Sequence, residues 1–186
     1  MAKTLILAKT APTDADSGVL RFVDGEDAVV MDDTYPVYEF HFYNLHPSVD
    51  AAKVMFQSSL DTGNNYNIST TTAFLQTYHS EGDGNETFSI NATYSAGNST
   101  SDIYLSDGVG FDDDQSASGV MTLYDPSDTD FVKNFTCEIQ QSSAGDTCNI
   151  SRVAGYINTT SAVDAIRFKF NSGNIDLGTI KMFGVS

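Results

Sequence analysis

Apolar and polar side chains alternate along several short stretches of this chain. The clearest case is Ala165–Phe170, in which Phe168 is flanked by Arg167 and Lys169. Tyr38–Tyr43 follows the same two-residue period. This period is typical of a β-strand with one buried face and one face in water. We therefore expect Phe168 to point into a core, and Arg167 and Lys169 to point toward solvent.

Turn-forming residues separate these stretches at short intervals. Asp61–Asn65, Glu81–Asn85 and Asn171–Asn174 are rich in Gly and Asn, which tolerate the positive φ of tight turns. Ser95–Ser118 is rich in Gly, Ser and Asp, and we expect long loops there around one weak strand. The pattern predicts an all-β protein. We expect an antiparallel β-sandwich of jelly-roll type, with short strands and long loops rich in Asn, Asp, Ser and Gly.

The chain length of 186 residues fits one domain, and no linker divides it. We expect residues 19–186 to form a single β-sandwich domain. Residues 1–18 would form either an N-terminal arm or an edge strand. Pro47–Phe56 could begin a helix, because proline is favoured in a first helical turn. We favour a loop followed by a strand at Lys53–Ser59.

The net charge of the chain argues against some classes of binding partner. The chain has 25 acidic and only 9 basic side chains, which gives a net charge of −16. Such a surface repels phosphate backbones and anionic lipids, so nucleic acid is not an expected partner. No apolar stretch reaches the 18 residues that suggest a membrane span, and no insertion into a membrane is expected. No signal peptide is visible either, so we expect synthesis in a cytosol.

Few residues suggest catalysis. His41, His46 and His79 lack the spacing of metal ligands, and we expect them at the surface or in loops. The sequence has no nucleophile elbow, phosphate-binding loop or dinucleotide fingerprint. We therefore expect a non-enzymatic protein with no catalytic and no cofactor-binding residues.

One acidic cluster and one pair of cysteines deserve separate hypotheses. Asp112, Asp113 and Asp114 could supply oxygen ligands to a weak Ca²⁺ site, and the alternative is a solvated acidic turn. Cys137 and Cys148 flank a turn-like segment at residues 142–146. If the segments beside that turn pair as a hairpin, the cysteines would lie nearly opposite each other and could form a disulfide. Free thiols are the alternative, because a cytosol keeps cysteines reduced.

Several strings of residues resemble a family of uncharacterised virion proteins from tailed phages that infect marine bacteria and cyanobacteria. They are Tyr38–Pro47 (YEFHFYNLHP), Phe56–Tyr66 (FQSSLDTGNNY), Leu123–Pro126 (LYDP) and Gly155–Val185 (GYINTTSAVDAIRFKFNSGNIDLGTIKMFGV). The likeness extends from about Val23 to the C-terminus, and the last string is its most specific part. The family is described as structural or tail-associated. The resemblance therefore implies a component of a virion, but it transfers no catalytic or binding residues.

This resemblance implies a structural component of a tailed-phage virion surface, assembled in the host cytoplasm. The protein would be a capsid decoration or cement protein, or a small tail-associated module. Other virion proteins are the expected partners, and we expect a homotrimer by analogy with fibres and cement proteins. The alternative function is a host receptor or glycan-binding module of a tail fibre. Tyr66, Tyr78 and Tyr104 would then stack on sugars from exposed loops.

The N-terminal segment supplies a candidate attachment site. Leu5, Ile6 and Leu7 form a short apolar run, and the following Ala11–Gly18 could act as a tether. In one hypothesis this run docks onto another virion protein. In the other it adds an edge strand to the sheet of its own domain.

Overall fold

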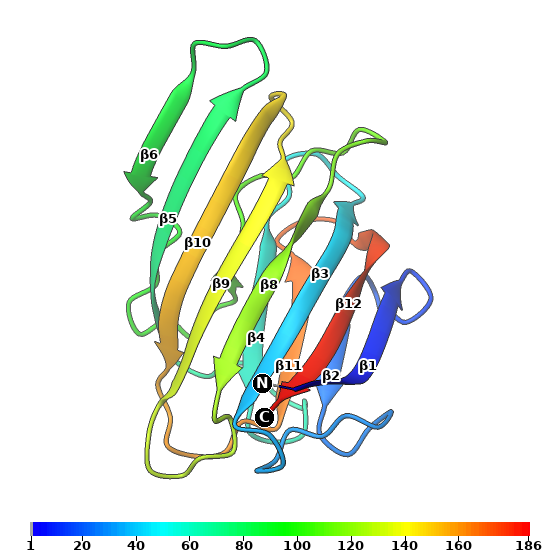
Figure 1. The fold of residues 1–186 in the computed structure, drawn as a ribbon, viewed down its shortest axis with the longest axis vertical. Coiled ribbons are helices and arrows are strands. Elements are labelled where there is room, and N and C mark those ends of the chain that lie inside the picture. Colours follow the sequence, from blue (N-terminus) through cyan, green and yellow to red (C-terminus); the bar gives the residue numbers. More distant parts are fainter. Residues whose placement is uncertain (1) are drawn as a thin grey trace.

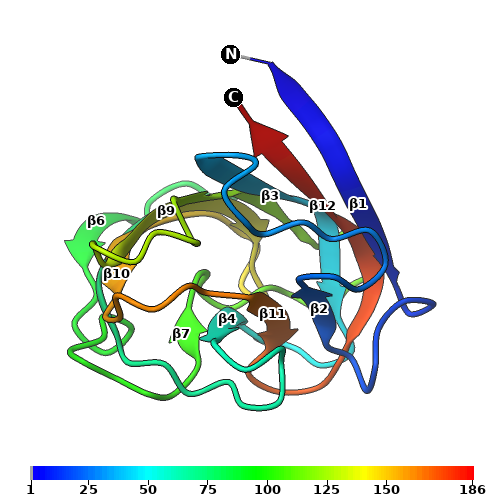
Figure 2. The ribbon, with the colours of Figure 1, turned by 90° about the horizontal axis from the view of Figure 1, so that it is seen from below.

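Two antiparallel β-sheets packed face to face make up the fold in the computed structural model, which describes residues 2–186 (Figures 1 and 2). The large sheet contains, in spatial order, β1 (Lys3–Ala11), β12 (Ile175–Val185), β3 (Val37–Pro47), β8 (Ala117–Tyr124), β9 (Lys133–Ser142), β10 (Thr147–Ile157), β5 (Thr70–Ser80) and β6 (Glu86–Ile90). The small sheet contains, in spatial order, β2 (Leu20–Val23), β11 (Ala165–Phe170), β4 (Val54–Ser59) and β7 (Ile103–Tyr104). No helix occurs among the described residues. The predicted all-β sandwich is confirmed.

The chain crosses repeatedly between the two layers, as it does in a jelly roll. β1 and β3 belong to the large sheet, whereas β2 and β4 belong to the small one. The division into eight and four strands departs from an eight-stranded jelly roll. Because the large sheet is wider, β5 and β6 extend beyond the small sheet (Figure 1). The loop after β6 covers part of this extension, where the Thr72 amide donates to the Ala96 carbonyl at 2.8 Å.

The core lies between the sheets, and aromatic side chains fill its centre. Phe168 on β11 is fully buried. Its ring contacts Phe22, Phe40 and Phe42 at centroid distances of 6.3, 5.2 and 5.1 Å. These residues come from both sheets, so a single ring joins the two layers. The predicted direction of Phe168 is confirmed.

Strand and turn expectations along the middle of the chain are also confirmed. β4 begins one residue after the expected Lys53, so the helix alternative for Pro47–Phe56 is wrong. Glu81–Asn85 connects β5 to β6, and Asp83 and Gly84 there have φ values of 54° and 104°. Between residues 95 and 118 the structure has only the two-residue strand β7 before β8 begins.

The N-terminal segment forms an edge strand. β1 pairs with β12 from Lys3 opposite Val185 to Ala11 opposite Gly178. The edge-strand alternative is therefore confirmed for Lys3–Ala11, and residues 12–18 form the turn that follows it. Met1 lies outside the described residues. Ile6 and Leu7 pack partly against the core, whereas the side chain of Leu5 is 52% exposed. The apolar run Leu5–Leu7 therefore belongs to the large sheet of its own domain.

Candidate functional site

The outer face of the large sheet, which points away from the small sheet, carries an ordered arrangement of side chains. β8, β9, β10 and β5 are interior strands, each hydrogen-bonded to a neighbour on both sides. Residues on these strands point alternately into the core and out to solvent. The strand register places the outward residues in rows that cross the strands. One row contains only small side chains: Thr122, Thr136, Ala154 and Ala73.

Rows that include larger side chains stand on both sides of this row. On one side lie Tyr124, Asn134, Tyr156 and Thr71. On the other side lie Val120, Glu138, Arg152 and Leu75. Two adjoining hollows of about 510 and 450 Å³ follow the small residues and share Thr136 and Ala154. The small row is thus the floor, and the larger rows are the walls, of what we call the cross-strand trough.

The trough combines apolar surface with polar groups but has no net charge. Tyr124 and Tyr156 are 39% and 36% exposed. Glu138 and Arg152, which form an ion pair, are the only charged side chains among the lining residues. In a protein with a net charge of −16, this neutrality is unusual. Such a lining suits an uncharged ligand that offers both apolar faces and hydrogen-bonding groups.

The three tyrosines that sequence analysis proposed for stacking on sugars do not lie in the trough. Tyr66 is half-buried beneath Arg167, whose guanidinium carbon lies 4.7 Å from the ring centroid. Burial raises the pKa of Tyr66. Tyr104 is also half-buried and packs against Tyr94 at a centroid distance of 4.9 Å. Tyr78 belongs to β5 rather than to a loop. The expectation of three exposed loop tyrosines is therefore wrong.

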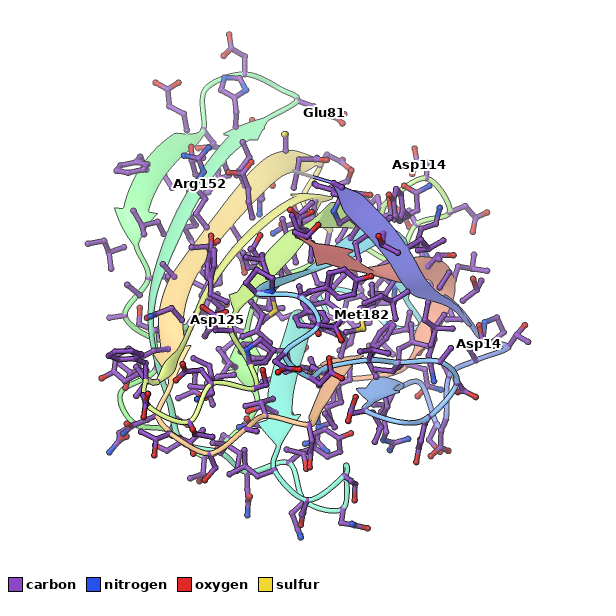
Figure 3. The ribbon with its side chains drawn as sticks, turned by 60° about the horizontal axis from the view of Figure 1, so that its bottom comes forward. Asp14, Glu81, Asp114, Asp125, Arg152 and Met182 are labelled. Atoms are coloured by element: carbon purple, nitrogen blue, oxygen red, sulfur yellow. The ribbon has the colours of Figure 1, made fainter. Side chains whose placement is uncertain are left out.

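In the acidic loop before β8, the three carboxylates proposed as calcium ligands do not gather into one cluster. Asp112 and Asp114 line a hollow of about 360 Å³ together with Glu81 and Asp146. Figure 3 labels Glu81 and Asp114, which come from different loops. Asp113 instead lines a neighbouring hollow. Within residues 2–186, no group of three or more His, Cys, Asp or Glu side chains is arranged to hold a metal ion. The three consecutive carboxylates do not converge, and their exposed side chains fit the alternative of a solvated acidic turn.

The imidazole of His46 forms hydrogen bonds with the backbone of this acidic loop. Its Nδ1 lies 2.8 Å from a carboxylate oxygen of Asp176, and its Nε2 lies 3.1 and 3.3 Å from the carbonyl oxygens of Phe111 and Asp112. Burial alone would lower the pKa of His46, but the hydrogen bond and charge of Asp176, with the two carbonyls, raise it. Since both ring nitrogens face acceptors, the charged imidazolium satisfies them all. The expectation of a surface histidine is wrong at this position, where only 8% of the residue is exposed.

Cys137 and Cys148 are both free thiols, so the disulfide hypothesis is wrong. β9 and β10 do form the expected hairpin, but Cys137 lies opposite Val153 and Cys148 lies opposite Ser142. Val153 is five residues beyond Cys148, and an odd offset puts two side chains on opposite faces of a strand. Cys137 accordingly points into the core, and burial raises the pKa of its thiol.

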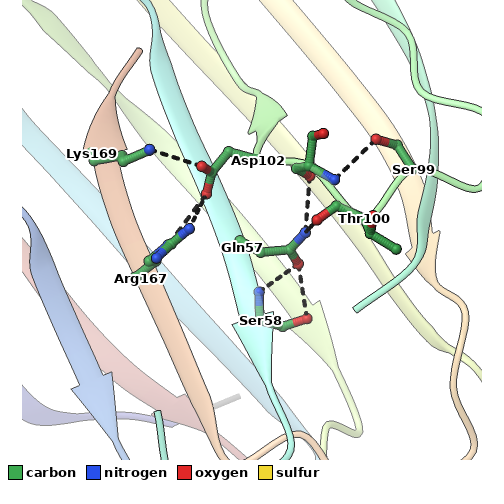
Figure 4. A network of polar contacts seen from close by, with 8 residues as sticks. Gln57, Ser58, Ser99, Thr100, Asp102, Arg167 and Lys169 are labelled. Carbon is green, nitrogen blue, oxygen red and sulfur yellow. Dashed lines mark hydrogen bonds and ion pairs between the residues drawn. The ribbon is translucent and has the colours of Figure 1, made fainter. Parts of the chain in front are cut away.

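The outer face of the small sheet carries a charged network (Figure 4). Asp102 accepts hydrogen bonds from Arg167 at 2.9 and 3.2 Å and pairs with Lys169 at 2.8 Å. Gln57, which lies opposite Arg167 in the strand register, is fully buried. Its amide donates to the carbonyls of Thr100 and Ser101 at 3.3 and 2.9 Å. These groups are satisfied by one another, which leaves little here to bind a ligand.

Comparison of the chain with protein-family models, with curated proteins and with solved structures found no match. In the part of the chain that the structure describes, no helix is long and apolar enough to cross a membrane.

Proposed function

We propose that this protein is a non-enzymatic structural component of a tailed-phage virion surface. It acts as a capsid decoration or cement protein, or as a small tail-associated module, and it is incorporated into virions in the host cytoplasm. The resemblance of the Gly155–Val185 string to virion proteins supports this proposal. That string forms the end of β10 and all of β11 and β12, which belong to both sheets.

The observation that carries the proposal is the apolar, unpaired edge of the large sheet at β6. Phe88 and Ile90 are 77% and 73% exposed. Leu75 on β5 lies opposite Ile90 and extends the apolar surface. An open strand edge with large apolar side chains favours association with another protein chain. Other virion proteins are the proposed partners, and a homotrimer is the proposed assembly.

The charge of the protein supports the same role. A net charge of −16 keeps many crowded copies from aggregating on a particle. It also disfavours contact with nucleic acid or with an anionic membrane surface. Association then depends on exposed apolar side chains such as Phe88 and Ile90.

A test uses a phage that encodes this chain. Quantitative mass spectrometry of purified particles should detect it, with hundreds of copies for a head protein and a few to a few dozen for a tail module. The double substitution Phe88→Ser and Ile90→Ser should leave the purified protein folded but remove it from particles. Leu177→Ser is the matched control, because Leu177 is 59% exposed but lies on β12. Particles that lack the wild-type chain, or that retain the double variant, would contradict the proposal.

A second candidate function is binding of a host glycan or receptor, as in a module of a tail fibre. The cross-strand trough is the observation that favours it, because it is a shallow, open depression, uncharged overall and lined by tyrosine, threonine and asparagine. This candidate is compatible with a place on the virion but does not depend on it.

A further inference from the structure

We propose that the cross-strand trough binds an uncharged oligosaccharide. This inference rests on the second candidate function and specifies its site and its class of ligand. It does not rest on incorporation into particles. The site differs from the loop tyrosines that the sequence suggests, and it is formed by four strands that are brought together only in the folded protein.

The paired state of the strands argues against a peptide as the ligand. A peptide that adds a strand to a sheet needs a free edge with unpaired N–H and C=O groups. β8, β9, β10 and β5 each have a hydrogen-bonded neighbour on both sides. The trough also crosses these strands rather than following them. Side chains alone, and not the backbone, are therefore available to a ligand in the trough.

The charges around the trough argue against an ionic ligand. Glu138 and Arg152 already neutralise each other across the β9–β10 pair. An anionic polysaccharide would also be repelled by the net charge of −16. A cation would find only one carboxylate in the lining, and that carboxylate is already paired. An uncharged ligand meets neither obstacle.

The side chains that remain have the chemistry to recognise a sugar. Tyr124 and Tyr156 offer half-exposed rings to the C–H faces of pyranose units, and their hydroxyl groups remain available for hydrogen bonds. Asn134 lies between them and can both donate and accept. Glu138 and Arg152 present further polar groups on the opposite wall. The first and last of the four strands lie about 14 Å apart, and this length of trough suits a short oligosaccharide rather than one monosaccharide.

The floor of the trough supplies the space. Ala154 and Ala73 lie opposite each other and Thr136 lies opposite Ala154, so no large side chain fills the centre. A large side chain at position 154 should therefore block the trough. Because Ala154 is exposed, such a change leaves the core intact.

The experiment is an amide-resolved NMR titration of the purified full chain. The probes are cellotriose, maltotriose, laminaritriose and chitotriose, with a trisaccharide of alginate and one of heparin as acidic comparisons. We expect at least one neutral probe to shift the amides of Ala73, Ala154 and Tyr156, and the acidic probes to shift none of them. Tyr156→Ala and Tyr124→Ala should each weaken binding about tenfold. Ala154→Phe should abolish it.

Tyr43→Ala is the matched control, because Tyr43 is 42% exposed on β3 but does not line the trough. Its affinity for the probe should equal that of the wild type. The proposal is overturned if no neutral probe causes shifts at millimolar concentration, or if the acidic probes bind more tightly. It is also overturned if Ala154→Phe still binds. A wild-type dimer in light scattering that Ala154→Phe dissociates would assign the trough to a second copy instead. None of these results depends on whether the protein is found in particles.

Discussion

The outer faces of the two sheets differ in how their side chains are arranged. On the small sheet, Asp102 pairs with both Arg167 and Lys169. The buried Gln57 donates its amide N–H groups to backbone carbonyls and accepts a hydrogen bond from the Ser58 amide. On the large sheet, the row through Thr136 and Ala154 carries only small side chains, and the Glu138–Arg152 ion pair stands beside it. The polar side chains on the small sheet bind one another, whereas the small side chains on the large sheet leave the trough open to solvent.

The difference shows which outer face has side chains that are free to contact a ligand. A β-sheet that is covered by mutually paired charges gains some stability but has few free groups for a ligand. A row of small outward residues, such as the floor of the trough, contributes little to stability. Residues at these positions can therefore vary to suit a ligand without unfolding the protein. Both sheets cover the same hydrophobic core.

The largest expected effect lies in that shared core. Phe168→Ala should lower the free energy of unfolding by about 3–5 kcal/mol, because it removes the ring that joins the two sheets and leaves a cavity. Phe88→Ala is the matched control, since the Phe88 side chain is 77% exposed and its loss should cost less than about 0.5 kcal/mol. Urea denaturation measures both values. Equal costs would mean that the assignment of buried and exposed faces is wrong.

The next effect separates the two faces. Asp102→Asn should lower the free energy of unfolding by about 1–2 kcal/mol, because Arg167 and Lys169 would lose the carboxylate that keeps two like charges together. Glu138→Gln removes a carboxylate from the exposed pair on the large sheet, and it should cost less than about 0.5 kcal/mol. Similar values for the two variants would show that the network on the small sheet is no more stabilising than an ordinary surface pair.

A smaller effect should appear in the dependence of stability on pH. The pKa of His46 is raised in the folded state, so its contribution is fully present below the unfolded value of 6.5. That contribution is lost as the pH rises through the folded pKa. The melting temperature of the wild type should therefore fall more steeply than that of His46→Gln as the pH rises above about 6.5. His79→Gln, which changes an exposed histidine, should follow the wild type. A His46→Gln curve parallel to that of the wild type would contradict the ionic hold on the acidic loop.

The smallest effect on stability is expected in the trough itself. Tyr156→Ala should change the free energy of unfolding by no more than about 0.5 kcal/mol, because the ring is partly exposed and packs against small neighbours. The same variant should lose affinity for a neutral oligosaccharide. Thermal melting checks the first expectation and calorimetric titration the second. A large loss of stability would mean that Tyr156 is a packing residue rather than part of a recognition surface.

Local patterns in the sequence predicted the strands well, because the two-residue period is decided within each strand. Ala165–Phe170 is predictable for this reason. β4 shows no such alternation, because all six of its residues are buried. The disulfide prediction is wrong because the residues of a hairpin pair at equal distances from its turn. Cys137 is five residues before Ser142, whereas Cys148 is only two residues after Asp146, so the two could not lie opposite each other. Counting from the turn would have shown this in advance.

The trough could not be predicted in the same way. Its floor depends on Thr122, Thr136, Ala154 and Ala73 sharing one row, and three separate strand pairings set that row. β5 pairs with β10, which lies some 80 residues later in the chain. Nothing local to Ala73 indicates this partner. His46 was mistaken for a surface residue for a related reason, because its acceptors come from β12 and from a distant loop.

The opposite orientation of the two cysteines gives the protein a single natural point for chemical labelling. The thiol of Cys137 is buried and its pKa is raised, so it forms little of the thiolate that reacts with maleimides. Cys148 is exposed at the start of β10, beside the hollow that Asp112 and Asp114 line. A fluorophore or spin label should therefore attach at this one position without any substitution. It would report on the acidic loop in the native sequence, at the end of the hairpin that also carries Arg152 and Tyr156.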